Sequence, residues 1–215
     1  MNPLDARGLH RFYRRGGSEV PALLDVSVTC EPGETLAVTG PSGSGKSTLL
    51  GLLAGLDDPD GGAVHVGGER ISHRSAAQAA RIRRAHVGVL TQTSGLLGHL
   101  TVRDNVRFAG SLSGRDEADA LLEILGLRDV ARSLPRTLSG GETARAGLAV
   151  ALAGAPTVLL ADEPTGEVSR PQEDLLLEAI ADLRPTDGAV VVVTHSSRVA
   201  AWADRVVHLV DGRVA

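Results

Sequence analysis

Residues 40–48 read Gly40-Pro41-Ser42-Gly43-Ser44-Gly45-Lys46-Ser47-Thr48. They match the pattern G-x-x-x-x-G-K-[ST], in which a glycine-rich turn cradles phosphate groups. Residues 35–39, before the turn, are mostly apolar or β-branched and predict a buried strand. Residues 47–54, after the turn, predict the start of a helix. A strand, a tight turn and a helix N-terminus present backbone N–H groups and the positive end of the helix dipole, which attract phosphate.

The side chains of this stretch fit the same interpretation. Gly43 and Gly45 allow a positive φ and a close approach of the backbone to a ligand. Lys46 can reach the terminal phosphates, and the hydroxyl of Ser47 can hold Mg²⁺. Lys46 is also the only lysine of the sequence, and its compact ammonium suits a point contact with phosphate better than a guanidinium does. The alternative is a glycine-rich turn that binds nothing, and the strand before it and the helix after it disfavour that alternative.

Length and composition limit the classes of protein to consider. A length of 215 residues predicts one domain. The net charge is −4, which does not indicate the basic surface that binds nucleic acid. The single Cys30 excludes an internal disulfide framework and suits a small core residue. Residues 1–5 do not resemble a signal peptide. The longest apolar stretch, 146–161, is interrupted by glycine and proline and is shorter than the roughly 20 residues that a membrane span requires. We therefore expect a soluble, cytosolic chain whose membrane role, if any, comes through a partner.

Short apolar runs alternate with helical patterns along the chain. Strands are expected at 4–14, as an edge strand, and at 23–30, 35–39, 63–66, 87–90, 157–161, 189–194 and 206–210, the last with a closing hairpin at 211–212. Helices are expected from 47, at 75–84, 102–112 and 117–125, from about 142 to 153, and at 171–183, with Thr101 and Ser113 as N-caps of the third and fourth. This alternation predicts a mostly parallel sheet covered on both faces, with residues 95–153 richer in helix than in strand.

Two carboxylates follow the apolar strand at 157–161. Asp162 lies where ligands bind in open α/β sheets and could hold Mg²⁺ through water, opposite Ser47. Glu163 could orient, or take a proton from, the water that attacks a γ-phosphate. A polar strand terminus without function is the alternative, and the phosphate loop upstream disfavours it.

His195 and Gln92 also follow buried strands. Because the strand ends converge on one edge of the sheet, we expect His195 to contact the γ-phosphate, although a lone histidine is more often structural. Gln92 could be both a ligand and a sensor of Mg²⁺, with an ordinary polar loop as the alternative.

A second anion-binding helix end is predicted at Leu138-Ser139-Gly140-Gly141-Glu142. Ser139 caps a helix, and Gly140 and Gly141 leave its first N–H groups bare. One nucleotide does not need two such ends from one chain. Two chains that face each other could each supply one, which predicts a sandwich dimer.

Together these motifs resemble an ATP-binding cassette ATPase, the motor subunit of membrane transporters, over essentially all 215 residues. The resemblance implies that 40–48 is the Walker A motif, Gln92 the Q-loop glutamine, 138–142 the signature, Asp162 and Glu163 the Walker B aspartate and the catalytic glutamate, His195 the switch histidine, and Tyr13 the aromatic that stacks on adenine. The implied fold is α/β: a P-loop NTPase core with a mixed, mostly parallel sheet, an N-terminal antiparallel β part and a small helical subdomain at about 95–153. ATP and Mg²⁺ are the implied ligands.

Within this family the stretch from 75 to 106 most resembles the lipoprotein-release and macrolide-efflux group. The resemblance implies a homodimer, or a pair with a similar cassette, held on the inner face of the cell membrane by a permease that docks near 92–108. We expect an ATP-hydrolysing motor for export or mechanotransmission. The alternatives are an importer ATPase, an ATP-dependent dimerising module with low turnover, and a soluble cassette protein of DNA repair or translation.

The chain departs from the family pattern at four places. The family usually has Asn-Leu-Asp or Ala-Leu-Asp where this chain has Glu167-Val168-Ser169, so the D-loop aspartate is missing. Ala144 replaces a glutamine after the signature, Val150 an arginine, and Ser196 an aspartate after the switch histidine. The groups expected to touch phosphate, Mg²⁺ or water are all kept. We therefore expect coupling and turnover to be affected more than ATP binding.

Overall fold

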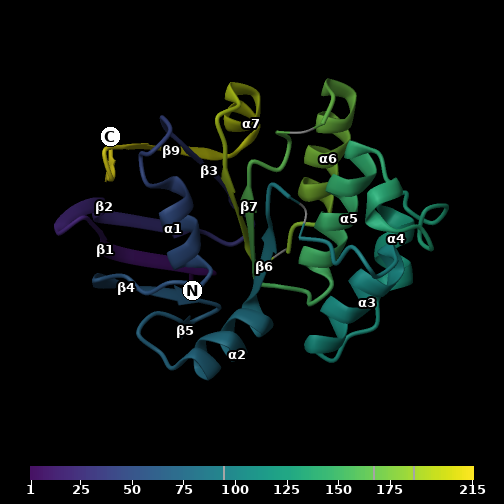
Figure 1. Cartoon of the computed structure of the whole chain (residues 1–215), viewed down its shortest axis with the longest axis horizontal. Helices are drawn as coiled ribbons and strands as arrows, with labels where there is room; N and C mark the ends of the chain where they lie inside the picture. Colours follow the sequence, from purple (N-terminus) through teal and green to yellow (C-terminus); the bar gives the residue numbers. More distant parts are fainter. Residues whose placement is uncertain (94, 167, 186) are drawn as a thin grey trace.

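The computed structural model describes residues 1–93, 95–166, 168–185 and 187–215, arranged as two sheets with helices around and between them (Figure 1). Glu167, part of the departure noted above, lies outside the described residues. No helix among the described residues combines the length and the apolar composition needed to cross a membrane.

The N-terminal sheet is antiparallel, as predicted, and has the strand order β2-β1-β4-β5. The predicted edge position of the first strand is wrong, because β1 pairs with β2 on one side and with β4 on the other. Its strands are β1 (Leu4–Arg15), β2 (Ser18–Cys30), β4 (Gly61–Val66) and β5 (Glu69–Arg70). The β1–β2 ladder shifts register three times between Ala6 and Phe12. Such irregularities bend and twist a strand, and β1 continues past them to Tyr13.

The second sheet has six strands in the order β10-β9-β3-β8-β7-β6. They are β3 (Thr35–Thr39), β6 (Val87–Leu90), β7 (Val158–Asp162), β8 (Ala189–Val193), β9 (Arg205–Val210) and β10 (Arg213–Val214). All neighbours pair in parallel except β9 and β10, which form the predicted hairpin. The mixed, mostly parallel sheet is thus confirmed.

Seven α-helices and one 3₁₀-helix are found in the described parts of the chain. They are α1 (Lys46–Leu53), α2 (Ala76–His86), α3 (Val102–Leu112), α4 (Ala118–Ile124), η1 (Pro135–Thr137), α5 (Gly140–Leu152), α6 (Arg170–Asp182) and α7 (Ser197–Trp202). The sequence did not predict the short elements β5, η1 and α7.

Both faces of the six-stranded sheet are covered, as β8 shows most clearly. Its Val191 and Val193 belong to the core shared with α1 and the antiparallel sheet. Its Val190 and Val192 belong to the core shared with α3, α5 and α6. A strand that packs on both faces must be apolar throughout, and all five residues of β8 are buried. In Figure 1 α1 lies between the two sheets and α3 to α6 lie on the other side.

The chain from 95 to 153, all of it described, contains α3, α4, η1 and α5 and no strand. That agrees with the expected helix-rich region, and its division as a separate helical subdomain of a single 1–215 domain stays a prediction. The cap at Thr101 is confirmed, because its side chain accepts a hydrogen bond from the N–H of Asp104.

The predicted cap at Ser113 is wrong. Ser113 is the C-cap of α3, and the N-cap of α4 is Glu117, which makes no side-chain cap bond. The hydroxyl of Ser113 instead donates to the carbonyl of Arg84, at 3.0 Å. A contact 29 residues away along the chain therefore replaces the local cap.

Candidate active site

A cavity of about 490 Å³ lies at the carboxyl ends of the parallel strands. Its lining combines residues from the phosphate loop with residues that follow β6, β7 and β8: Tyr13, Ala22, Ser42, Gly43, Gly45, Lys46, Ser47, Thr48, Gln92, Asp162, Glu163, Gly166, Val193 and His195. Parallel strands bring segments far apart in sequence to this edge. Gly40, Pro41 and Ser44 belong to the same loop but do not line the cavity.

The phosphate loop has the backbone that the sequence predicts. Gly43 and Gly45 have φ of 80° and 103°. A Cβ added at Gly45 would lie 2.4 Å from the carbonyl oxygen of Ala22, and one added at Gly40 would lie 2.0 Å from that of Leu209. At positions 40 and 45, glycine is therefore required both for the backbone conformation and because a side chain would not fit.

Lys46 is the first residue of α1 and only 6 % exposed. Its Nζ donates to the carbonyl oxygens of Gly40 and Pro41, both at 2.9 Å. The ammonium thus lies against the loop itself, within reach of the space the loop encloses. The N-cap of α1 is Gly45, which has no side chain to satisfy the first N–H groups. A helix end of this kind suits phosphate.

Asp162 ends β7 and is partly buried. Burial raises the pKa of its carboxyl group, and the neighbouring Glu163 raises it further, while Lys46 and His195 act in the opposite direction. Two carboxylates and one ammonium at the end of a sheet make this the most strongly charged part of the cavity.

Glu163 has a positive φ of 45°, which is uncommon outside glycine. Its N–H donates to the carbonyl of Val193 at 2.9 Å. Its Oε2 accepts hydrogen bonds from the hydroxyl of Thr194 and the N–H of His195, both at 3.2 Å. Its Oε1 is buried, accepts no hydrogen bond from the described residues, and lies 3.5 Å from Nε2 of His195. The side chain is therefore held by the residues that follow β8.

The oxygen donors of the cavity fit Mg²⁺. Ser47, Asp162 and Gln92 all line it and supply a hydroxyl, a carboxylate and an amide oxygen. Among the described residues no cluster of three or more histidine, cysteine or acidic side chains could hold a metal. Mg²⁺ is usually bound by one or two carboxylates together with phosphate oxygens and water, so the few protein ligands seen here agree with it.

Tyr13 reaches the cavity from β1 and is held from two sides. The guanidinium Cζ of Arg11 lies 4.9 Å from its ring centroid. Its hydroxyl lies 3.4 Å from Oδ2 of Asp57. Arg11 also pairs with Asp57 at 2.8 Å and with Asp60 at 3.3 Å. The sequence pointed to Tyr13 but not to Arg11 or Asp57, because the contacts that Asp57 makes with Tyr13 and Arg11 join residues 44 and 46 positions apart.

The signature residues lie outside this cavity. Ser139 caps α5 in a capping box: its hydroxyl accepts from the N–H of Glu142 at 3.3 Å, and Oε2 of Glu142 accepts from the N–H of Ser139 at 2.8 Å. Gly140 lines a smaller neighbouring hollow of about 160 Å³ together with Gln92 and Glu163. Gly141 is buried, with the side chain of Gln172 directly over it. One chain does not bring Ser139 and Lys46 into one cavity.

Besides Arg11 and Asp57, four further lining or supporting residues were missed from the sequence: Ala22, Gly166, Val193 and Thr194. The signal for Thr194 was a hydroxyl within an otherwise apolar run, next to His195. The other three are small or apolar, and only the folded chain reveals their position.

The family model described as "ABC transporter" matches residues 23–166. The chain belongs to the ABC transporter family, as an ATPase domain. Macrolide export ATP-binding/permease protein MacB of Rhodopseudomonas palustris is 42 % identical over 214 residues, which are 97 % of this chain and 33 % of that protein. The protein of the same name from Burkholderia pseudomallei is 40 % identical over 210 residues, 95 % of this chain and 32 % of that protein. This chain therefore spans about a third of the length of these relatives.

Solved ABC cassettes have the same fold. The cassette MJ0796, in a dimeric post-hydrolysis state bound to ADP and Pi, superposes with a TM-score of 0.91 at 31 % identity, covering 98 % of this chain and 96 % of that one. CbiO1 of Clostridium perfringens, part of the transporter complex cbiONQ, gives a TM-score of 0.85 at 24 % identity, covering 100 % of this chain and 87 % of that one. Because CbiO1 is only 24 % identical to this chain, its similarity supports the fold alone. The expected α/β P-loop NTPase fold is confirmed.

Proposed function

We propose that this chain binds and hydrolyses ATP with Mg²⁺ and thereby drives export through a membrane permease. The observation that carries the proposal is the single cavity at the strand ends, which joins Lys46 and Ser47 with Asp162, Glu163 and His195. The relatives named for macrolide export carry a permease as well as an ATP-binding part. The importer alternative has less support from these names, and the cargo stays open.

Each residue has a distinct chemical role in this proposal. The loop N–H groups and the Nζ of Lys46 bind the triphosphate, the ammonium leaving the carbonyls of Gly40 and Pro41. Oε1 of Glu163, which accepts no hydrogen bond from the described residues, takes a proton from the attacking water. His195 lies beside this oxygen and contacts the γ-phosphate. Ser47, Asp162 and Gln92 would hold Mg²⁺, which would neutralise phosphate charge when bound.

Dimerisation is part of the proposal. The α5 end at Ser139 is a second anion site that this chain's own cavity does not use. In a sandwich of two copies, each α5 end would face the triphosphate bound to the other copy. The related cassette MJ0796 is described as dimeric, which supports this arrangement.

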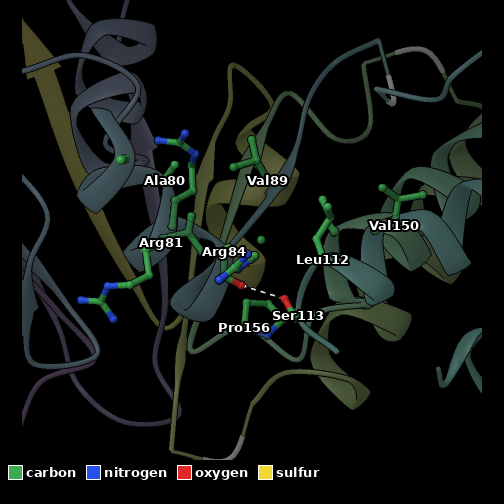
Figure 2. A pocket seen from close by; sticks show the side chains of 15 residues that line it. Ala80, Arg81, Arg84, Val89, Leu112, Ser113, Val150 and Pro156 are labelled. Atoms are coloured by element: carbon green, nitrogen blue, oxygen red, sulfur yellow. Dashed lines mark hydrogen bonds between the residues drawn. The ribbon is translucent and has the colours of Figure 1, made fainter. Parts of the chain in front are cut away.

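The permease is proposed to dock near the segment 92–108 and to reach a groove whose lining residues lie outside that segment. A groove of about 570 Å³ lies between α2, β6, α3 and α5. Figure 2 shows Leu112 and Val150 on one wall and Arg81 and Arg84 on the other. Phe108 and Leu112, one helical turn apart on α3, are both 51 % exposed. An apolar face next to arginines suits an amphipathic helix of the permease that carries an acidic residue. Such docking would hold the chain on the inner face of the cell membrane.

The test is hydrolysis by Glu163→Gln beside wild type. We expect a loss of at least about 100-fold in kcat, the usual scale for a general base, with Mg-ATP binding retained. Lys46→Ala is the control that should lose binding. The same Glu163→Gln protein with ATP should remain dimeric and recover the permease from membranes. Hydrolysis at the wild-type rate by Glu163→Gln would refute the mechanism, and failure of the wild type to bind Mg-ATP would refute the function.

A dimerising module with low turnover is the second candidate. Ser169 replaces the aspartate of the family and is the N-cap of α6, but its side chain makes no cap hydrogen bond. Val150 replaces an arginine on α5 and packs beside the core. Turnover by the wild type well above that of Lys46→Ala would exclude this candidate.

A further inference from the structure

Thr194 is a buried hydroxyl at the edge of the cavity. It directly follows β8, and none of its surface is exposed. Its N–H donates to the carbonyl of Val38 at 3.1 Å, so the backbone is fixed to β3. Its hydroxyl lies 3.0 Å from the N–H of Ser196 and 3.2 Å from Oε2 of Glu163. Since the amide can only donate, the hydroxyl accepts from Ser196 and directs its one hydrogen to Glu163.

The two oxygens of Glu163 are consequently not equivalent. Oε2 accepts from the hydroxyl of Thr194 and from the N–H of His195. Oε1 is buried and accepts no hydrogen bond from the described chain. A buried carboxylate oxygen that lacks a donor is costly in free energy, and the positive φ of Glu163 adds strain. Both are features that a structure keeps only when the surroundings impose them.

We propose that Thr194 is a positioning residue for Glu163. Its hydroxyl binds Oε2 and so fixes the carboxylate with Oε1 beside Nε2 of His195, at 3.5 Å, in a residue that lines the cavity. The inference rests on the proposed hydrolytic function. It adds a residue that acts through Glu163 and does not itself touch ATP. A purely structural role, in which Thr194 only fills space at the end of β8, is the competing explanation.

Thr194→Val and Thr194→Ser separate the two explanations. Valine has nearly the same shape and lacks the hydroxyl, whereas serine keeps the hydroxyl and loses a methyl group. We expect Thr194→Val to lower kcat about 10- to 100-fold while the KM for ATP changes less than about twofold. Thr194→Ser should stay within about threefold of wild type. If the kcat of Thr194→Val equals that of the wild type, or if Thr194→Ser loses as much kcat as Thr194→Val, the proposal is overturned. Thr194→Ala, which also lacks the hydroxyl, serves if the valine protein does not fold.

A double variant tests whether Thr194 acts through Glu163. Residues that work as a unit show non-additive losses. In the Glu163→Gln background, we expect Thr194→Val to lower the remaining rate less than about twofold. A further loss as large as in the wild-type background would mean that Thr194 acts elsewhere and would overturn the proposal.

Amide hydrogen exchange of the nucleotide-free protein gives a readout without hydrolysis. Thr194→Val removes the acceptor of the N–H of Ser196 and one donor to Glu163. Exchange of the His195 amide, whose N–H donates to Oε2 of Glu163, should be at least about fivefold faster when it is resolved from that of Ser196, and Thr194→Ser should restore its protection. Unchanged protection in Thr194→Val overturns the positioning role. If the wild type hydrolysed no ATP, the proposed function would fail, and the exchange result would still decide whether this hydroxyl holds Glu163.

Discussion

The guanidinium of Arg11 lies over the ring of Tyr13, with its Cζ 4.9 Å from the ring centroid. Arg11 is itself held by Asp57 and Asp60, which follow α1. Arginine thus backs the tyrosine proposed to stack on adenine, on a β1 strand whose ladder with β2 is irregular. An aromatic ring fixed in this way loses less freedom when a base stacks on it.

Replacing Arg11 should therefore weaken binding of the base and spare binding of the phosphates. A cation–π contact at an exposed site is worth about 0.5–1 kcal/mol, so Arg11→Ala should bind ATP roughly two- to fivefold more weakly. Inorganic triphosphate, which has no base, should bind unchanged, as measured by calorimetry. Arg14→Ala, on the same strand and paired with Glu19 at 3.6 Å, is the control. Equal weakening of both ligands would contradict the role given to Tyr13.

The capping box of α5 should contribute to the stability of the folded protein at neutral pH, and this contribution should be lost at low pH. The pKa of Glu142 is lowered because its carboxylate accepts hydrogen bonds from the backbone N–H and the hydroxyl of Ser139. A lowered pKa in the folded state means that this stabilisation is complete above the unfolded pKa near 4.3 and is lost as pH falls through the folded value. At pH 7 Glu142→Gln should be less stable by about 0.5 kcal/mol.

Thermal unfolding between pH 3 and pH 7 checks this expectation. The difference in stability between wild type and Glu142→Gln should shrink toward zero as the pH approaches 3. Glu178→Gln, on the exposed side of α6, is the matched control and should show no such convergence. A constant difference across the pH range would mean that the carboxylate does not contribute through its charge.

Two glycine-to-alanine substitutions should change the free energy of unfolding in opposite directions. A Cβ at Gly88, in β6, would lie 2.3 Å from the backbone oxygen of Ala151 in α5, which cannot move cheaply. Gly88→Ala should therefore lower the free energy of unfolding by about 1–3 kcal/mol. Gly51 lies inside α1 with no atom within 4 Å of such a Cβ. Gly51→Ala should raise stability by about 0.5–1 kcal/mol. Urea unfolding measures both, and shifts of the same sign would refute the packing argument.

Cys30 should be unreactive in the folded protein. Burial raises the pKa of its thiol to about 12, with Glu34 adding to the shift and Arg205 opposing it. Only the thiolate reacts with alkylating agents, so iodoacetamide at pH 8 should leave the native chain unmodified and label it fully in urea. Mass spectrometry distinguishes the two. Rapid labelling of the native protein would show that β2 opens at this end.

Patterns that span neighbouring residues predicted most of the fold. β7, β8 and the phosphate loop could be recognised because an apolar run or a fixed glycine spacing determines them locally. Ser113 was misassigned as an N-cap because its hydroxyl bonds to Arg84, a contact that no local pattern contains. The short elements β5, η1 and α7 carry too few residues to show a period.

The candidate site divides in the same way. Lys46, Asp162, Glu163, Gln92 and His195 could be found because each stands at a strand or helix end within a motif, and they line one cavity. Thr194 and Arg11 could not, because Thr194 acts through Glu163, 31 positions away, and Arg11 is held over Tyr13 by Asp57, 46 positions away. The placement of Ser139 on a second copy's ligand depends on assembly, which the single chain does not contain.

Lys46 has a practical consequence that follows from its being the only side-chain amine in these 215 residues. Acylating reagents that modify amines have one side-chain target besides the α-amino group, and its Nζ donates hydrogen bonds to the carbonyls of Gly40 and Pro41 in the loop. Coupling the protein to a sensor surface through the lysine side chain would therefore block the phosphate loop, where ATP is proposed to bind. Conversely, the extent of acylation is a footprint of how often the loop releases this amine.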